Sequence, residues 1–350
     1  MKKLALRRRK AAKQEAPSRI TNETVAEHRE RILAGGRRFK YPMQYARHKL
    51  VVNTILVTVA ALVILALVGW WQLYSVQNTN TFFYRVTRVL PLPVASVDGE
   101  TVYYGDYLMY YNSSAHYLQQ TEQINLDSED GKRQVDFIKR KSMDTVLADA
   151  YAEKLARGLA ISVSDERIDK VIDEDRNTAN GRISQETYDA SALNILGWTP
   201  SEYRQDAKSK LLRQEVSYAI DENARKASSR AEALLKAEAD LDKAALQLGG
   251  EGTAKPEVGM SGLVPKTNRD GGLSKAAAQL EVGQVSPVIR TTTGDGYYFV
   301  KLLEKTDTQV NYGYIKIPLT EFKKRLVALK KDNKIKEYIS VPEVQGQTNQ

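Results

Sequence analysis

The sequence predicts an α+β chain in which a single transmembrane helix precedes a mostly helical module and a small α+β domain. Three observations predict this. Residues 50–71 carry no charge, apolar residues at helical spacing dominate 106–216, and from residue 216 strand-like segments alternate with an alanine-rich helix and a glycine-rich stretch. The 350 residues include no cysteine, which excludes disulfides and Cys-ligated zinc or iron–sulfur sites.

The positive charge of the chain is concentrated before the uncharged run. Residues 1–49 hold 15 Lys and Arg against 4 Glu, a net of +11, so the rest of the chain carries −2 of the total of +9. Basic residues beside an apolar run set membrane orientation and contact anionic lipid. A basic arm for nucleic acid is the alternative interpretation of such a segment, but we expect no nucleic-acid partner here.

The uncharged run has the length of a membrane span, since 22 residues at about 1.5 Å each extend about 33 Å. Trp70 and Trp71 lie at one end, where aromatic residues favour the membrane interface. A cleaved signal peptide has an apolar region of only about 7–15 residues. We therefore expect an uncleaved transmembrane helix over 50–74, with the basic segment 1–49 in the cytoplasm and the remainder outside.

Residues 75–93 read as a linker, and the first folded element is a hairpin over 94–104. Its Asp98-Gly99 pair is typical of a two-residue type I′ turn. A helix over 106–120 follows, with its tyrosines on one broad face. This face either lines a groove for apolar segments of other chains or packs against neighbouring helices.

Helical signals continue to residue 216. A long helix is expected over 132–157, and Thr199-Pro200 is an N-cap followed by a proline at the first helical position. Three stretches then carry a family resemblance: VASVDGETVYYGDYLMYY, EKLARGLAISVSDERI and LGWTPSEYRQDAKSKLLRQ. They resemble the helical N-terminal chaperone module of the SurA/PrsA family of extracytoplasmic foldases, and this resemblance implies such a module over 94–215.

The segment 216–305 resembles the parvulin class of peptidyl-prolyl isomerases. The expected order is a strand at 216–220, a helix at 224–248 and a terminal strand from 297. The sequence GQVSPV at 283–288 and the pair Gly296-Tyr297 match the family pattern. The position of the family's histidine in the last strand is Tyr298, and the first strand, near Tyr218, has no histidine either. The resemblance therefore implies a degenerate site without catalytic residues.

The remaining residues are expected to return to the first module. Residues 309–318 read as a strand and 319–339 as a helix, and in the family such a pair completes the N-terminal module, here over 306–340. Residues 341–350 are expected to form a disordered tail. The only histidine beyond residue 48 is His116, which has no metal-ligand spacing around it.

We therefore expect a membrane-anchored extracytoplasmic chaperone whose partners are unfolded or nascent exported proteins, with membrane lipid bound by 50–74 and the basic segment. An active peptidyl-prolyl isomerase and a non-enzymatic envelope scaffold are the alternatives. No catalytic residue, metal or cofactor is expected. The candidate peptide-binding residues are tyrosines, because their rings offer large amphipathic contact area. They are Tyr107, Tyr110, Tyr111, Tyr218 and Tyr298.

Overall fold

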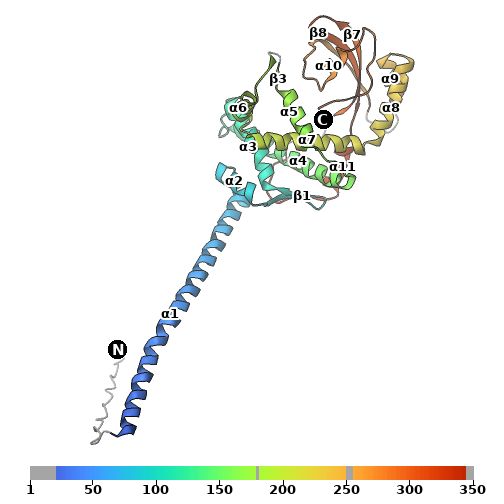
Figure 1. Ribbon diagram of the computed structural model, residues 1–350. Coiled ribbons are helices and arrows are strands. Elements are labelled where there is room, and N and C mark those ends of the chain that lie inside the picture. The colour runs from blue at the N-terminus through green and yellow to red at the C-terminus, as the bar shows by residue number, and fades with distance from the viewer. Residues whose placement is uncertain (1–20, 179–180, 250–254, 344–350) are drawn as a thin grey trace. The chain divides into compact units, whose positions relative to one another are not determined.

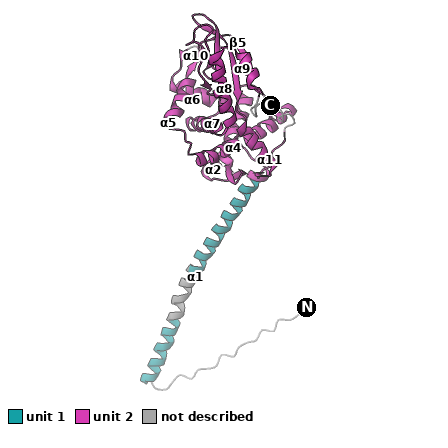
Figure 2. Ribbon diagram, turned by 90° about the vertical axis from the view of Figure 1, so that its right-hand side faces the viewer, with its two compact units in different colours: residues 1–72 teal, residues 73–350 magenta. Residues whose placement is uncertain are grey.

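The computed structural model describes residues 21–343 except 179–180 and 250–254, and of residues 36–47 only the backbone. The first 20 residues of the basic segment and residues 344–350 of the expected tail lie outside this description. The chain divides into two compact units, residues 1–72 and 73–350 (Figure 2).

Helix α1 (Asn22–Trp70) is the main element of the first unit, and the π-helical turn η1 (Trp71–Ser75) follows it (Figure 1). The helix begins after Thr21, whose backbone N–H donates to the Thr24 hydroxyl at 3.0 Å. The most apolar 18-residue window of the segment His48–Ser75 has a mean hydropathy of 2.8, and none of that window is buried. By length and composition it is the one candidate membrane span in the described part of the chain.

Helices and two small sheets form the first part of the second unit. The elements are α2 (Thr81–Val89), β1 (Pro93–Val97), β2 (Glu100–Tyr103), α3 (Tyr104–Gln120), α4 (Glu129–Leu159), α5 (Asp165–Asp175), β3 (Asn177–Thr178), β4 (Gly181–Arg182), α6 (Gln185–Leu196) and α7 (Pro200–Ile220). Asp98 and Gly99 have φ of 48° and 84°, which confirms the predicted hairpin turn between β1 and β2. Helix α2 lies within the segment that we expected to be a linker.

Two hydrophobic cores organise this helical part. The first contains Tyr104, Tyr107 and Met143, so it joins β1, β2, α3 and α4. The second contains Met109 and Trp198, and it joins the other side of α3 to α5, α6 and α7. Helix α3 packs on both sides because its apolar residues spread over a wide face.

The end of the chain returns to the first core. Helix α11 (Glu321–Lys331) and strand β9 (Ile335–Glu337) bring Leu329 and Ile339 into it, and β9 pairs antiparallel with β1. Arg140 of α4 is almost buried and pairs with Glu337 of β9 at 2.6 Å and with Asp144 at 2.8 Å. Residues more than 200 positions apart therefore share one core and one three-stranded sheet.

A four-stranded antiparallel sheet organises the other part of the second unit. Its elements are α8 (Glu222–Ala237), α9 (Leu241–Leu248), β5 (Glu257–Pro265), α10 (Leu273–Ala277), β6 (Ile289–Arg290), β7 (Gly296–Lys305) and β8 (Gln309–Pro318). The strand order is β5-β8-β7-β6. Along β7 the side chains alternate, so that Phe299 packs in the core under α8 and α9 while Val300 packs in the core beside α10.

The structure corrects two expectations, one about strand β8 and one about residues 216–220. Strand β8 belongs to this sheet, between β5 and β7, and not to the helical module that we expected over 306–340. The physical reason is burial on both faces, since Tyr312 faces one core and Ile315 the other. The expected strand at 216–220 is the last turn of α7, because Val216 and Tyr218 are buried there by tertiary packing that overrides their β propensity.

The predicted helix over 224–248 is also interrupted. Residues 238–240 separate α8 from α9, and the carboxylate of Asp240 accepts from the Lys243 N–H at 3.0 Å. The capping carboxylate starts a second helix in a new direction. At the level of fold class, the predicted α+β chain with one apolar helix, a helical module and a small sheet-containing domain is confirmed.

Candidate functional site

A cleft of about 660 Å³ lies between α5, α7 and the loop after β6. Val171, Leu211 and Tyr218 give it apolar and aromatic walls. Charged residues of both signs also line it: Glu166, Arg167, Lys170, Glu174, Glu215 and Arg290. Apolar walls with mixed charges suit a segment of polypeptide, whose side chains are apolar and whose backbone carries both donors and acceptors.

A side pocket of about 320 Å³ adjoins the cleft between α5, α6 and α7, and the two hollows share Val171, Leu211, Gln214 and Thr292. Its aromatic walls are Tyr188, Trp198 and Tyr203. Asp206 also lines it, and that side chain is 6% exposed. One Asp206 carboxylate oxygen pairs with Lys210 at 2.8 Å, while the other has no hydrogen-bond partner in the described structure.

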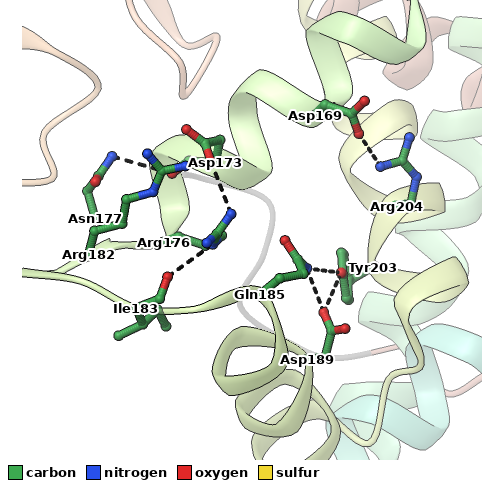
Figure 3. Close-up of polar contacts among 10 residues, drawn as sticks. All are labelled: Asp169, Asp173, Arg176, Asn177, Arg182, Ile183, Gln185, Asp189, Tyr203 and Arg204. Carbon is green, nitrogen blue, oxygen red and sulfur yellow. Dashed lines mark hydrogen bonds and ion pairs between the residues drawn. The ribbon is translucent and has the colours of Figure 1, made fainter.

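Polar contacts hold the arm formed by α5, β3, β4 and α6, which walls the side pocket (Figure 3). Asp173 of α5 accepts from Arg176 at 3.2 Å and also pairs with Arg182 of β4. Asp189 of α6 accepts from the Tyr203 hydroxyl of α7 at 2.7 Å. Further contacts in the same view join Gln185 to Asp189 and Arg204 to Asp169. The bonds of Tyr203 to Asp189 and of Arg204 to Asp169 join the arm to α7.

The opposite wall of the cleft is fixed to α7 by direct contacts. Gln214 donates to the Thr291 carbonyl at 2.5 Å, and the Tyr218 hydroxyl donates to the Gly296 carbonyl at 2.6 Å. The guanidinium of Arg290 lies 5.0 Å from the Tyr218 ring centroid, a cation–π distance. Burial raises the pKa of Tyr218 to about 12, so its hydroxyl remains a neutral donor at physiological pH.

A second polar cluster lies on the sheet face beside α10. The Tyr298 hydroxyl donates to Asp295 at 2.7 Å, and the Lys316 ammonium pairs with the same carboxylate at 3.0 Å. Partial burial acts to raise the pKa of Asp295, but hydrogen bonds from Thr293, Tyr298 and Lys316 outweigh it and hold the pKa well below its usual range. Burial and the Asp295 carboxylate raise the pKa of Tyr298. Tyr298 is therefore a neutral hydrogen-bond donor and not a base.

The strand opposite Tyr298 is not the one that we expected. Tyr298 lies directly across from Lys316 of β8, and its ring is 5.9 Å from that of Tyr314. Tyr218, which we expected on the opposing first strand, is on helix α7. The chain has no histidine after His116, whose ring lies 2.8 Å from the Asn194 carbonyl on another part of the unit. Neither β8, which lies beside Tyr298, nor residues 216–220, which we expected there, therefore supplies a histidine.

The five candidate tyrosines do not form one surface. Tyr107 and Tyr111 stack at 6.2 Å and are buried, and Tyr110 donates to Asp149 at 2.9 Å from between the two helical cores. Tyr218 is in the core under α8 and Tyr298 in the core beside α10. Only Tyr218 lines the cleft. Of the two interpretations of the tyrosine face on α3, packing against neighbouring elements is the one that fits Tyr107 and Tyr110.

Tyr111 reaches a different hollow, about 850 Å³ in volume, that lies between α2, α3 and the start of α7. Arg85 and Arg88 of α2 and Trp198 also line it. Trp198 thus stands between this hollow and the side pocket, and its indole N–H donates to the Met109 carbonyl at 3.4 Å. The three hollows surround the second core of the helical part.

Several site residues have no distinguishing pattern in the sequence. Asp206 and Arg290 are single charges in mixed segments, and only the fold brings them to a hollow. Asp295 has a local signal, because it lies in the glycine turn at 294–296. In the parts of the chain that the structure describes, no group of three or more acidic or histidine residues has the arrangement of a metal site.

Two protein-family models match the chain. A model described as a SurA-like N-terminal domain matches residues 43–217, and one described as a PPIC-type PPIASE domain matches residues 199–311. Together they define the class of foldases in which a chaperone domain is joined to a parvulin-type isomerase domain. The first match covers half of the chain, so the chain belongs to the SurA-like family, in the SurA/PrsA-type arrangement that the sequence resembles. No curated protein matches the chain.

Proposed function

We propose that this chain is a membrane-anchored extracytoplasmic chaperone that binds unfolded exported polypeptides in the cleft and the side pocket. The observation that carries the proposal is the pair of adjoining hollows between α5, α6, α7 and the loop after β6, which share four lining residues and have apolar walls and charges of both signs. Such a hollow accepts apolar side chains and leaves the client's backbone near polar groups. The SurA-like family match supports the same function.

The test uses Val171, which lines both hollows and is only partly buried. Val171→Lys places a charge on the apolar wall. We expect the full chain in detergent micelles to lose its ability to suppress aggregation of a chemically denatured client. Val327→Lys is the matched control, because Val327 is 61% exposed on α11 and outside both hollows. Equal suppression by the two variants, or none by the unmodified chain, would contradict the proposal.

The membrane topology is part of the proposal. Basic residues before the apolar segment favour a cytoplasmic N-terminus, which leaves residues 75–350 outside. The chain has no cysteine, so single cysteines introduced at Lys3 and Lys331 report sidedness with a membrane-impermeant maleimide. We expect Lys331→Cys to be labelled in intact cells and Lys3→Cys only after permeabilisation. The reverse pattern, or labelling of both, would overturn the topology.

The domain division that we propose follows the contacts. The helical module comprises 73–220 and is completed by 319–341, whereas the sheet domain comprises 221–318. This boundary assigns β8 to the sheet domain. Anchoring such a unit near the membrane raises the local concentration of weak binding sites where chains emerge.

Prolyl isomerisation is a second candidate, favoured by the PPIC-type match. The reaction needs no covalent step, because a site that binds the twisted amide more tightly than the planar one lowers the barrier of about 18–20 kcal/mol. Tyr298 offers a neutral donor at the position of the family's histidine. If this function is correct, the chain accelerates cis–trans exchange of a proline peptide and Tyr298→Phe changes the rate. Exchange no faster than in buffer would refute it.

A further inference from the structure

Strand β5 is an edge strand of the four-stranded sheet. It runs for nine residues and pairs with β8 on one side, while no described strand pairs with its other side. In an antiparallel strand, alternate residues direct their N–H and C=O groups away from the neighbour. The outer side of β5 therefore presents a row of backbone donors and acceptors to a further chain.

The side chains of β5 do not block this edge. Val258, Met260 and Leu263 are 41%, 76% and 49% exposed. The charge at one end, Glu257, is directed to Lys316 at 3.5 Å, and the proline lies at the other end. Proteins commonly protect an edge strand by central charges or prolines, by a bulge or by keeping it very short. Of these features β5 has only a bulge, at 261–262, which leaves residues 257–260 regular.

The other edge of the same sheet is protected. Strand β6 is only two residues long, and one of them is Arg290, which stacks on Tyr218. The next residue, Thr291, is bonded to α7 through Gln214. The sheet is thus open at one edge and closed at the other.

The register defines what an added strand would contact. Gly259 lies opposite Tyr314, which packs on the sheet face beside α10, so Gly259 belongs to that same face. Val258 and Met260 lie on the opposite face, where α9 packs against β5. A bulge at 261–262 divides the strand. There Gly262 has a φ of 65°, and the Ser261 hydroxyl accepts from the Tyr312 N–H at 2.9 Å. The segment before the bulge, residues 257–260, is the regular part of the edge.

We infer that the β5 edge binds extended apolar segments of unfolded polypeptides by strand addition, as a site separate from the cleft. Unpaired backbone groups select a partner in extended conformation, and exposed Val258 and Met260 select apolar side chains at alternate positions. An unfolded chain supplies both features, whereas a folded protein has few free strands. The identity of the partner rests on the proposed chaperone function, but the site does not depend on the cleft.

The experiment uses the full chain in lipid nanodiscs and an uncharged ten-residue peptide of alternating Val and Thr. Amide hydrogen exchange is measured by mass spectrometry with and without the peptide. We expect exchange in 257–265 to slow about tenfold, and a peptide N-methylated at alternate residues to have no such effect because it cannot pair as a strand. Met260→Lys is expected to weaken binding about tenfold, because the added strand no longer buries an apolar side chain there. Val327→Lys is the charge control.

Each outcome separates the two sites. Slower exchange in the cleft without a change in β5 overturns the edge inference and leaves the chaperone proposal standing. If protection of the β5 amides increases with protein concentration in the absence of peptide, a second copy of the chain occupies the edge. That result also overturns the edge inference. Equal protection by the N-methylated peptide contradicts strand pairing. If the peptide slows exchange nowhere while the chain still suppresses aggregation, only the edge inference fails, and if both are negative, both proposals fail.

Discussion

Asp221 is the residue whose replacement should most clearly show how the parts of the second unit depend on each other. Its side chain is buried, with 3% of the residue exposed. One carboxylate oxygen caps α8 by accepting from the Ala224 N–H at 2.9 Å. The other accepts from the N–H groups of Thr320 and Glu321, at 2.8 and 3.0 Å, where α11 begins. One carboxylate therefore starts two helices that are 100 residues apart.

The magnitude of the effect follows from the three bonds. Loss of an N-cap side chain costs about 1 kcal/mol, and each buried N–H left without a partner costs about 1–3 kcal/mol. We expect Asp221→Ala to reduce the free energy of unfolding by about 3 kcal/mol, allowing for water that reaches one of the freed groups. Asp221→Asn should cost less, because its amide oxygen still caps one helix.

The assay must resolve helices, because a chain of this size need not unfold in one step. Amide exchange in increasing urea, followed in peptides that cover α8 and α11, measures both helices in one sample. Asp240→Ala is the control, since the partly exposed Asp240 caps only α9, and its effect should be smaller and confined to that helix. If Asp221→Ala destabilises α8 and leaves α11 unchanged, the carboxylate does not couple the two helices.

Three further predictions concern other buried contacts. Arg140→Ala should destabilise the first core by about 3–5 kcal/mol, because it leaves Glu337 unpaired. Amide hydrogen exchange in β9 should then accelerate, and unchanged exchange there would contradict the prediction. The depressed pKa of Asp295 contributes stability that is present above the unfolded pKa of about 4 and lost as the pH falls below it. Urea midpoints between pH 5 and 2 should therefore fall less steeply in Asp295→Asn, and equal slopes would refute the assignment. Gly259→Val should destabilise the sheet, because a Cβ there lies 2.5 Å from the Tyr314 hydroxyl oxygen; an unchanged urea midpoint would show that the ring moves aside freely.

Local sequence signals predicted several elements of the helical part. The pair Asp98-Gly99 specified a hairpin turn because few other dipeptides adopt positive φ at both positions, and Thr199-Pro200 specified the start of α7. The GQVSPV stretch and the missing histidines were also visible without a structure. These features depend on residues close together in the chain, where one or two backbone preferences decide the outcome.

Errors occurred where distant contacts outweighed local preference. Val216 and Tyr218 favour a strand but end a helix, because burial between α7's neighbours contributes more than the small difference in propensity. The face of tyrosines on α3 was compatible both with a groove and with packing against neighbouring helices, and the structure places Tyr107 in the core. A period in the sequence identifies a buried face, but it does not distinguish a face buried by the protein itself from one that awaits a partner.

The sequence by itself determined the single apolar helix, the charge asymmetry around it, the two-part α+β organisation and the family. All of these depend on composition and on short-range pattern. Only the tertiary structure decided that β8 occupies the sheet between β5 and β7, that the cleft forms between α5, α7 and the loop after β6, and that β5 is left as an open edge. The physical reason is that strand pairing and hollows are made by residues far apart in the chain, whose contacts follow from burial of whole faces and not from any local preference.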